Sequence, residues 1–298
     1  MENRQLWELI YNTWTAIVDQ YDPVFDRYRE QNWLDSWSLG LLFAALTFEP
    51  DAISAASLAM RGPYTADDAY RSRLAALAER EYLAEAVPGQ YRMTAHGRSE
   101  SDEVIQAAYQ VMVQADPLPA KESRRLGELL EVLVQACMHI PPPPDTWSID
   151  LSYRLMPTRD MRLPYIEQAI SCLNGYRDDA HLAAWRPTGI SPTALESLTL
   201  LWRGQAASLS ELFERLANRG NPMSEYTRAL EELRQQGYLV GPDDALRLTA
   251  AGQAFRQRVE EDTDHYFFAP WGCLDQAARQ ELYRLLTRLA DGLKPRQV

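Results

Sequence analysis

The stretch that decides the fold runs from Tyr226 to Gly252 and reads YTRALEELRQQGYLVGPDDALRLTAAG. Apolar residues three and four apart predict a helix, the segment around Gly241 predicts a turn between two short strands, and Thr249-x-x-Gly252 predicts the start of a further helix. The same pattern occurs earlier, from Tyr70 to Gly97, as YRSRLAALAEREYLAEAVPGQYRMTAHG. The separation is 156 residues (226 − 70) before the turn and 155 (252 − 97) after it. One unit therefore occurs twice.

The likeness extends toward the N-terminal side of both stretches. Ser38 to Phe43, SLGLLF, aligns with Ser197 to Trp202, SLTLLW, at a separation of 159 (197 − 38). Three short helices, a two-strand ribbon and a closing helix are the order of a winged helix-turn-helix, in which the helix before the ribbon enters the major groove of DNA. We predict an internal duplication of this unit.

These patterns predict a mainly α fold with small β-ribbons, of the α+β class, with tandem winged helix-turn-helix modules. The first module is expected at 1–100, a helical connecting region at 101–190, and the second module with a C-terminal helix at 191–298. Several finer expectations concern helix ends. They are Ser36 or Ser38 as the cap of the helix after Asp35, a short helix from Ile53 to Met60, a capping box of Thr65 and Asp68, and connecting helices over Trp147 to Met156 and Tyr165 to Leu173.

Composition limits the classes of partner. The chain has 298 residues, with 42 acidic and 30 basic side chains and a net charge of −12, so DNA contact requires a local basic patch that works against the overall field. Apolar runs of about 18 residues and a secretory N-terminal pattern are both missing from the sequence, so we expect a cytoplasmic protein without a membrane partner. Three scattered cysteines, Cys137, Cys172 and Cys273, indicate reduced thiols rather than a disulfide framework.

Neither candidate reading helix carries a basic stripe. Thr65 to Glu81 has three arginines against four acidic residues, 3 − 4 = −1, and Pro222 to Gln236 has two against three, 2 − 3 = −1. The second turn, from Gly241 to Asp244, would bring two carboxylates toward a phosphate. We therefore expect the first module to be the better DNA reader. The candidate DNA contacts are Arg71, Arg73 and Arg92 in the first module and Arg228 in the second.

Two polar clusters are candidates for a ligand site. Asp178 and His181 lie three residues apart, a spacing that can bind a divalent metal or hold one histidine tautomer. The alternative is structural: Asp178 begins a helix, His181 bonds to it, and Trp185 packs beneath. The second cluster, Glu260 to His265, precedes Tyr266 and Phe267. We predict a cleft lined by Asp178, His181, Trp185, Tyr266 and Phe267, without a metal or cofactor; metal-dependent catalysis near His181 is the remaining alternative.

Enzymatic activity has no positive support in the sequence. The chain contains no phosphate loop, GxGxxG, HExxH or GxSxG pattern. We therefore expect a protein that is not an enzyme.

The segment from Asp179 to Ala184, DAHLAA, with Gly189, Thr249-x-x-Gly252, Glu260-x-x-Thr263-Asp264 and Pro270-Trp271, resembles the SalK-like helix-turn-helix family of bacterial proteins, related in its wing to MarR regulators. The resemblance covers about Leu163 to Leu289 well and the first module more loosely. It implies a tandem winged-helix architecture and a regulatory role. The acidic second wing departs from a DNA-binding MarR-like module.

Two functional hypotheses follow from the sequence. The first is a MarR-like winged-helix transcriptional regulator that binds double-stranded DNA and responds to a small-molecule effector, either as a monomer with an internal pseudo-twofold axis or as a homodimer. The second is a small-molecule or protein-interaction module derived from a winged helix, without DNA binding.

Overall fold

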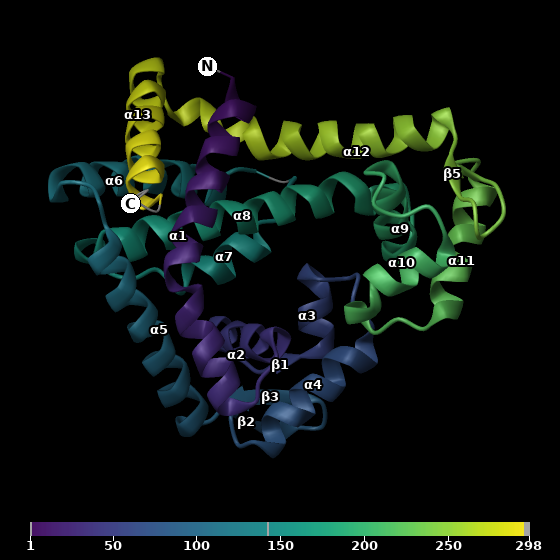
Figure 1. The fold of residues 1–298 in the computed structure, drawn as a ribbon, viewed down its shortest axis with the longest axis horizontal. Coiled ribbons are helices and arrows are strands. Elements are labelled where there is room, and N and C mark those ends of the chain that lie inside the picture. The colour runs from purple at the N-terminus through teal and green to yellow at the C-terminus, as the bar shows by residue number, and fades with distance from the viewer. Residues whose placement is uncertain (1, 142, 295–298) are drawn as a thin grey trace.

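A scaffold of long helices carries the two modules in the computed structural model, which describes residues 2–141 and 143–294. Figure 1 shows α8 crossing the middle, α12 above it, and the modules below and to the right. The main scaffold helices are α1 (Asn3–Asn32), α5 (Ala95–Ala115), α6 (Ala120–Met138), α7 (Trp147–Tyr153), α8 (Leu163–Trp185), α12 (Ala250–Phe268) and α13 (Gln276–Leu293). Short 3₁₀ turns η1 (Arg159–Met161), η2 (Arg186–Thr188) and η4 (Ala269–Cys273) complete it.

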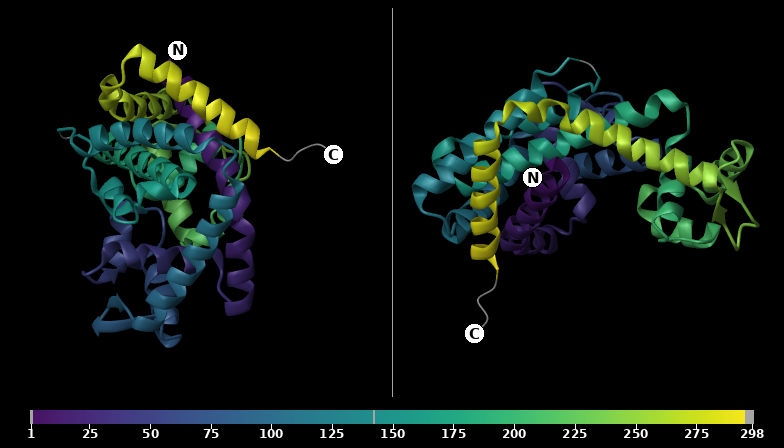
Figure 2. Two further views of the ribbon diagram at one scale, coloured as in Figure 1. Left: turned by 90° about the vertical axis from the view of Figure 1, so that its left-hand side faces the viewer. Right: turned by 90° about the horizontal axis from the view of Figure 1, so that it is seen from above.

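The scaffold has its own hydrophobic core. Helix α8 packs against α6, α7 and α12, while α1 packs along α5 and α13. Apolar residues spaced three and four apart on each helix fill the space between them, as Leu126, Leu130 and Leu133 do on α6. Seen from above, α12 extends from α13 to the second module (Figure 2). Helix α12 thus connects the scaffold to the second module.

The first module has a separate core beneath the scaffold. Its strands form an antiparallel sheet of order β1-β3-β2, with Ile53 opposite Tyr91 and Leu83 opposite Met93. Its core includes Leu42, Leu74 and Leu83. The elements are α2 (Ser36–Phe48), β1 (Ile53–Ser54), α3 (Ala55–Arg61), α4 (Asp67–Glu79), β2 (Leu83–Val87) and β3 (Gln90–Met93), followed by α5.

The second module repeats this order around a third core. Two strands pair antiparallel, with Leu239 opposite Leu248. Where β1 pairs with β3 in the first module, the second has a bond from Leu246 N–H to Ala207 O at 2.8 Å. The elements are α9 (Pro192–Trp202), α10 (Leu209–Arg215), η3 (Ala217–Arg219), α11 (Met223–Gln235), β4 (Leu239–Val240) and β5 (Arg247–Leu248), followed by α12.

Some aligned positions of the two modules make matching contacts. Tyr70 and Tyr226 are both buried, and each hydroxyl donates to a backbone carbonyl oxygen that precedes its helix, although the acceptors, Gly62 O and Leu216 O, are not at aligned positions. Thr94 accepts a hydrogen bond from the N–H three residues later and so caps α5, and Thr249 caps α12 in the same way. The two threonine caps thus match at aligned positions, whereas the two tyrosine hydroxyls do not share an acceptor position.

Some predicted helix starts are wrong. The Asp35 carboxylate accepts from Ser38 N–H, so Asp35, and neither of the two serines, caps α2. Ile53 lies in β1, because the helix begins only after Ser54. Helix α4 has no side-chain cap, so Thr65 and Asp68 form no capping box.

The largest correction concerns the connecting region. The predicted helix from Tyr165 to Leu173 is the first part of α8, which continues to Trp185. Asp178 and His181 are therefore in the second half of one long helix. The structural alternative that placed Asp178 at a helix N-terminus is wrong.

Candidate ligand-binding cavity between the modules

An open cavity lies where α8 meets the two modules. It has two adjoining lobes of about 800 Å³ and about 620 Å³. Aromatic side chains from α1, α2 and α7, including Trp14, Trp37 and Trp147, line the larger lobe. Both lobes share lining residues from α8 and from the turns that precede α4 and α11: Tyr64, Asn174, Asp178, His181 and Arg219.

One face of α8 supplies the polar wall. Ser171, Asn174, Asp178 and His181 follow one another at three or four residues, so they project from the same side of the helix. The opposite side of α8 is buried in the scaffold core. The cavity wall is therefore fixed by a helix that packing holds in place.

Adjacent aspartates on α8 have different roles. Asp178 forms an ion pair with Arg61 of α3, Nη2 to Oδ2 at 3.1 Å. Asp179 is buried and accepts from Ser148 N–H at 2.8 Å and Ile149 N–H at 3.0 Å, which caps the start of α7. Burial raises the pKa of Asp179 to about 6. Asp178 thus faces the first module, and Asp179 holds α7.

His181 is held in one tautomer by a hydroxyl. Thr263 donates its hydroxyl proton to Val259 O at 2.6 Å, so its oxygen accepts from His181 Nδ1 at 3.2 Å. This assignment leaves Nε2 as a hydrogen-bond acceptor. Burial, followed by the positive charge of Arg256, lowers the pKa of His181 to about 4. His181 is therefore neutral at pH 7.

The pKa of His181 predicts a pH dependence of stability. Because the folded pKa lies below the unfolded value of 6.5, the unfolded chain binds more protons between these values, and stability falls as pH falls from 6.5 toward 4. His181→Asn keeps a donor toward Thr263 and should remove roughly 1–2 kcal/mol of the loss between pH 7 and pH 5. Urea denaturation at both pH values measures this. His265→Asn, at an exposed histidine on α12, is the control; equal losses in wild type and His181→Asn would contradict the prediction.

Arg256 is the most buried charge at the cavity, with only 3% of the residue exposed. Its Nε donates to Thr199 Oγ1 at 2.9 Å, and its Nη2 donates to Glu260 Oε2 at 3.0 Å. The guanidinium lies 5.0 Å from the ring centroid of Trp202. Its Nη1 is buried and has no hydrogen-bond partner among the described residues. Burial lowers the pKa of Arg256. Burial would raise the pKa of Glu260, but Arg256 and Arg177 outweigh it, so that pKa lies below its ordinary value.

The turns before α4 and α11 touch each other at the edge of the cavity. Ala66 N–H donates to Arg219 O at 2.9 Å, and Asn221 Nδ2 donates to Tyr64 O at 2.8 Å. The Arg219 guanidinium lies 5.7 Å from the Tyr64 ring centroid. We call this the turn contact. The candidate reading helices, α4 and α11, both begin beside it.

The structure separates the residues predicted to form one cleft. Asp178 and His181 line both lobes. Trp185 is buried against Tyr64, with ring centroids 6.0 Å apart. Tyr266 lines a different pocket, and Phe267 is fully buried in the scaffold core. The predicted common cleft is therefore wrong for the last three: Trp185, at the end of α8, packs against Tyr64, and Phe267 of α12 packs against Trp7 of α1 in the scaffold core.

The predicted DNA-contacting arginines are differently engaged. Arg71 pairs with Asp67 on α4, and Arg228 pairs with Glu225 on α11. Arg73 lies 4.9 Å from the Trp37 ring centroid, and its Nη2 is 3.5 Å from Asn218 O in the second module. Arg92 is exposed on β3. In this state Arg73 supports the contact between modules rather than an open reading surface.

Sequence reasoning missed Asn174, Arg203, Arg219 and Arg256. The sequence contains a signal for Asn174. If one helix spans Ser171 to His181, polar residues recur along it at intervals of three and four residues, and Asn174 is one of them. The sequence also contains a signal for Arg256, which lies on the inward-facing stripe of α12 with Gly252, Val259 and Thr263. Arg203 follows the end of α9 and Arg219 ends the short turn η3, so neither belongs to a helical pattern.

Across 2–141 and 143–294, no three His, Cys, Asp or Glu side chains are grouped so as to bind a metal ion. In the same residues, no helix combines the length and apolarity that crossing a membrane requires.

Comparison with known proteins places the C-terminal half. Residues 153–298 match the model of a helix-turn-helix family. This stretch begins at the end of α7 and includes α8, the second module and α13, so four of the five residues shared by the lobes, all except Tyr64, fall within it. Neither a curated protein nor a solved structure is significantly similar to the chain. The predicted likeness to a helix-turn-helix family is confirmed for this half.

Proposed function

We propose that the protein is a DNA-binding regulator with two winged-helix modules, related to MarR-like proteins, whose relative position responds to a small molecule in the cavity. The observation that carries this proposal is that Tyr64 and Arg219 belong both to the turn contact and to the walls of both lobes. A ligand there touches the residues that hold the modules together. It can therefore favour one module arrangement over another.

The helix-turn-helix match supports the DNA part of the proposal. Reading helices contact bases mainly through their N-terminal residues. Those ends of α4 and α11 lie at the turn contact, so separation of the modules would free them. We propose that the described arrangement is the one with lower DNA affinity.

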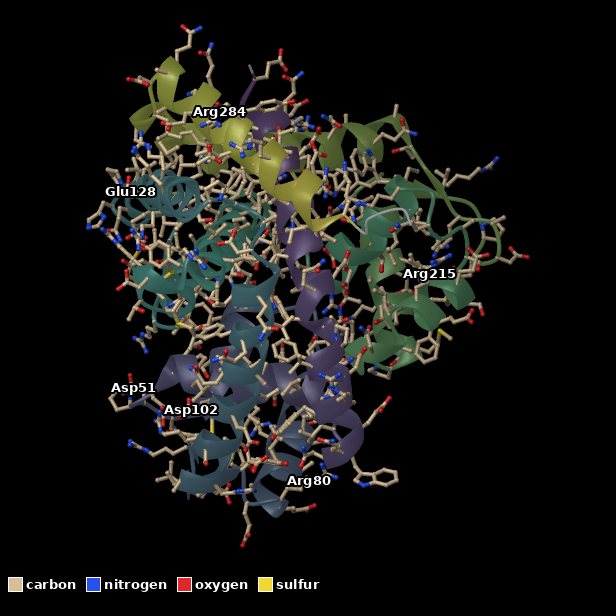
Figure 3. The ribbon with its side chains drawn as sticks, turned by 60° about the vertical axis from the view of Figure 1, so that its left-hand side comes forward. Asp51, Arg80, Asp102, Glu128, Arg215 and Arg284 are labelled. Carbon is tan, nitrogen blue, oxygen red and sulfur yellow. The ribbon has the colours of Figure 1, made fainter. Side chains whose placement is uncertain are left out.

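A titration of labelled, mixed-sequence duplex DNA at low salt, followed by fluorescence anisotropy, tests DNA binding. We expect a Kd between about 10⁻⁶ and 10⁻⁴ M. Arg228→Ala should weaken binding uniformly and lower the salt slope by about one, because Arg228 is 73% exposed and suited to a phosphate. Arg284→Ala on α13 is the matched control, since Arg284 lies far from the modules (Figure 3). Binding weaker than about 10⁻⁴ M would reject the DNA function if it is found both for wild type and for Gly220→Ala, a variant designed to move the two modules apart.

The second candidate is a small-molecule binding protein that keeps the winged fold without reading DNA. The charges of the reading helices favour it: α4 has two arginines against three acidic residues, 2 − 3 = −1, and so has α11. The basic residues Arg80, Arg215 and Arg284 are dispersed over the surface (Figure 3). This candidate predicts ligand binding in the cavity with no DNA affinity in any module arrangement.

A further inference from the structure

We infer that the cavity binds a small organic anion with an aromatic body, whose acidic group is held by Arg256 and Asn174 while its rings occupy the larger lobe. This inference rests on the proposed function only in its choice of cavity, and it names the ligand class of that site. It does not require DNA binding.

Arg256 is the first support. It reaches the smaller lobe from α12, is almost fully buried, and has two of its three nitrogens bonded to Thr199 and Glu260. The buried Nη1 has no partner in the described chain. A buried charged donor without a partner is costly. An anionic oxygen is the partner that satisfies it best, because a charge-assisted bond is stronger than a neutral one.

Asn174 supplies a second unsatisfied donor. Its Nδ2 is buried without a partner among the described residues, and Asn174 lines both lobes. Arg256 and Asn174 come from α12 and α8, which pack against each other. Two helices fixed by packing thus present donors to one space, as a preorganised anion site requires.

The charge of the smaller lobe agrees with an anion. Its lining has the arginines Arg177, Arg203, Arg219 and Arg256 against Asp178, Glu196 and Glu260, 4 − 3 = +1. The whole chain carries −12. A net positive lobe in a strongly acidic protein selects an anion by its local field.

The larger lobe defines the rest of the ligand. Aromatic residues Trp14, Trp37, Phe43 and Trp147 line it, together with aliphatic side chains of α2. Its volume of about 800 Å³ is within the range of sites for drug-sized molecules, which are mostly apolar with a few polar groups that fix orientation. The two lobes together therefore suit an amphipathic molecule with one acidic end.

Two fluorescent probes that differ in a single group test the inference on the full chain. One is 8-anilinonaphthalene-1-sulfonate, and the other is N-phenyl-1-naphthylamine, the same ring system without the sulfonate. We expect the sulfonate to bind at least about tenfold tighter. Arg256→Met should remove this preference, a loss of about tenfold to a hundredfold for the sulfonate only. Arg258→Met, at an exposed position on the same helix, makes the same charge change and should leave both affinities unaltered.

Folding of Arg256→Met is supported by Arg177, which still pairs with Glu260 at 2.9 Å. If circular dichroism shows that this variant is unfolded, Asn174→Asp tests the inference instead. This substitution keeps the shape of the side chain and places a negative charge at the site. It should weaken the sulfonate probe about tenfold and spare the neutral one. Equal binding of both probes by wild type, or unchanged sulfonate binding in a folded variant, would overturn the inference. Since no DNA is present, a protein that binds the sulfonate but not duplex DNA loses only the regulator proposal.

Discussion

Gly252→Ala is expected to lower the free energy of unfolding by about 3 kcal/mol, the upper part of the range for an overpacked buried site. A Cβ at Gly252 would lie 2.3 Å from Tyr238 O, and backbone atoms cannot move aside as a flexible side chain can. The glycine N–H also binds Thr249 Oγ1 at 3.0 Å, so a shift of the first turn of α12 would weaken its cap. Urea denaturation followed by circular dichroism measures the change.

Gly97→Ala is the paired test in the first module. A Cβ there would lie 2.1 Å from Tyr82 O, the aligned backbone atom. We expect a loss similar to that of Gly252→Ala. Gly40→Ala is the control, because a Cβ on this helical glycine meets nothing within 4 Å; it should stabilise the protein by about 0.5–1 kcal/mol. A denaturation midpoint equal to that of wild type in either test variant would show that the turn does not require glycine.

These two glycines illustrate what the sequence can predict. Thr94-x-x-Gly97 and Thr249-x-x-Gly252 are local: the hydroxyl caps the helix three residues later, so spacing alone defines the contact. The same spacing predicted where α12 begins. The internal duplication stays a prediction from the repeated pattern.

The cap of α4 and the extent of α8 could not be predicted in this way. Thr65 has the residue type of a cap, but the start of α4 is held instead by the turn contact, through Ala66 N–H and Arg219 O. Helix α8 was cut short because polar residues interrupt its apolar stripe. Those polar residues face the cavity, which only the tertiary fold creates. A single sequence does not show that they have a common side.

The candidate site was predictable only in part, for the same reason. Asp178 and His181 were identified because they are close in sequence. Arg256 lies 75 residues (256 − 181) after His181 and meets it only because α12 packs on α8. Its burial depends on Trp202 and Thr199 of α9, a third element. The stripe along α12 indicates that Arg256 faces inward, but only these contacts decide which side chains it meets there.

Gly220→Ala is expected to tighten binding of mixed-sequence duplex DNA at least about fivefold, the lower end of typical coupling between two sites. A Cβ on Gly220 would lie 2.6 Å from Ala69 Cβ across the turn contact. Relief of this clash requires the modules to move apart. Two reading helices that occupy successive major grooves must be about 34 Å apart, whereas α4 and α11 begin side by side here. Separation thus removes an obstacle to DNA binding by either helix.

Backbone strain must be distinguished from the clash, because Gly220 has φ of +72°, a region that alanine disfavours by about 1 kcal/mol. Gly189→Ala provides the match: Gly189 has φ of +73°, also follows a 3₁₀ turn, and would place its Cβ in open space. Gly189→Ala should leave DNA affinity unaltered. Small-angle scattering supplies the second readout, with a larger radius of gyration expected for Gly220→Ala alone. If Gly220→Ala has a larger radius of gyration but no gain in DNA affinity, the turn contact hides no reading surface. If neither the radius of gyration nor the DNA affinity changes, this contact does not hold the modules together.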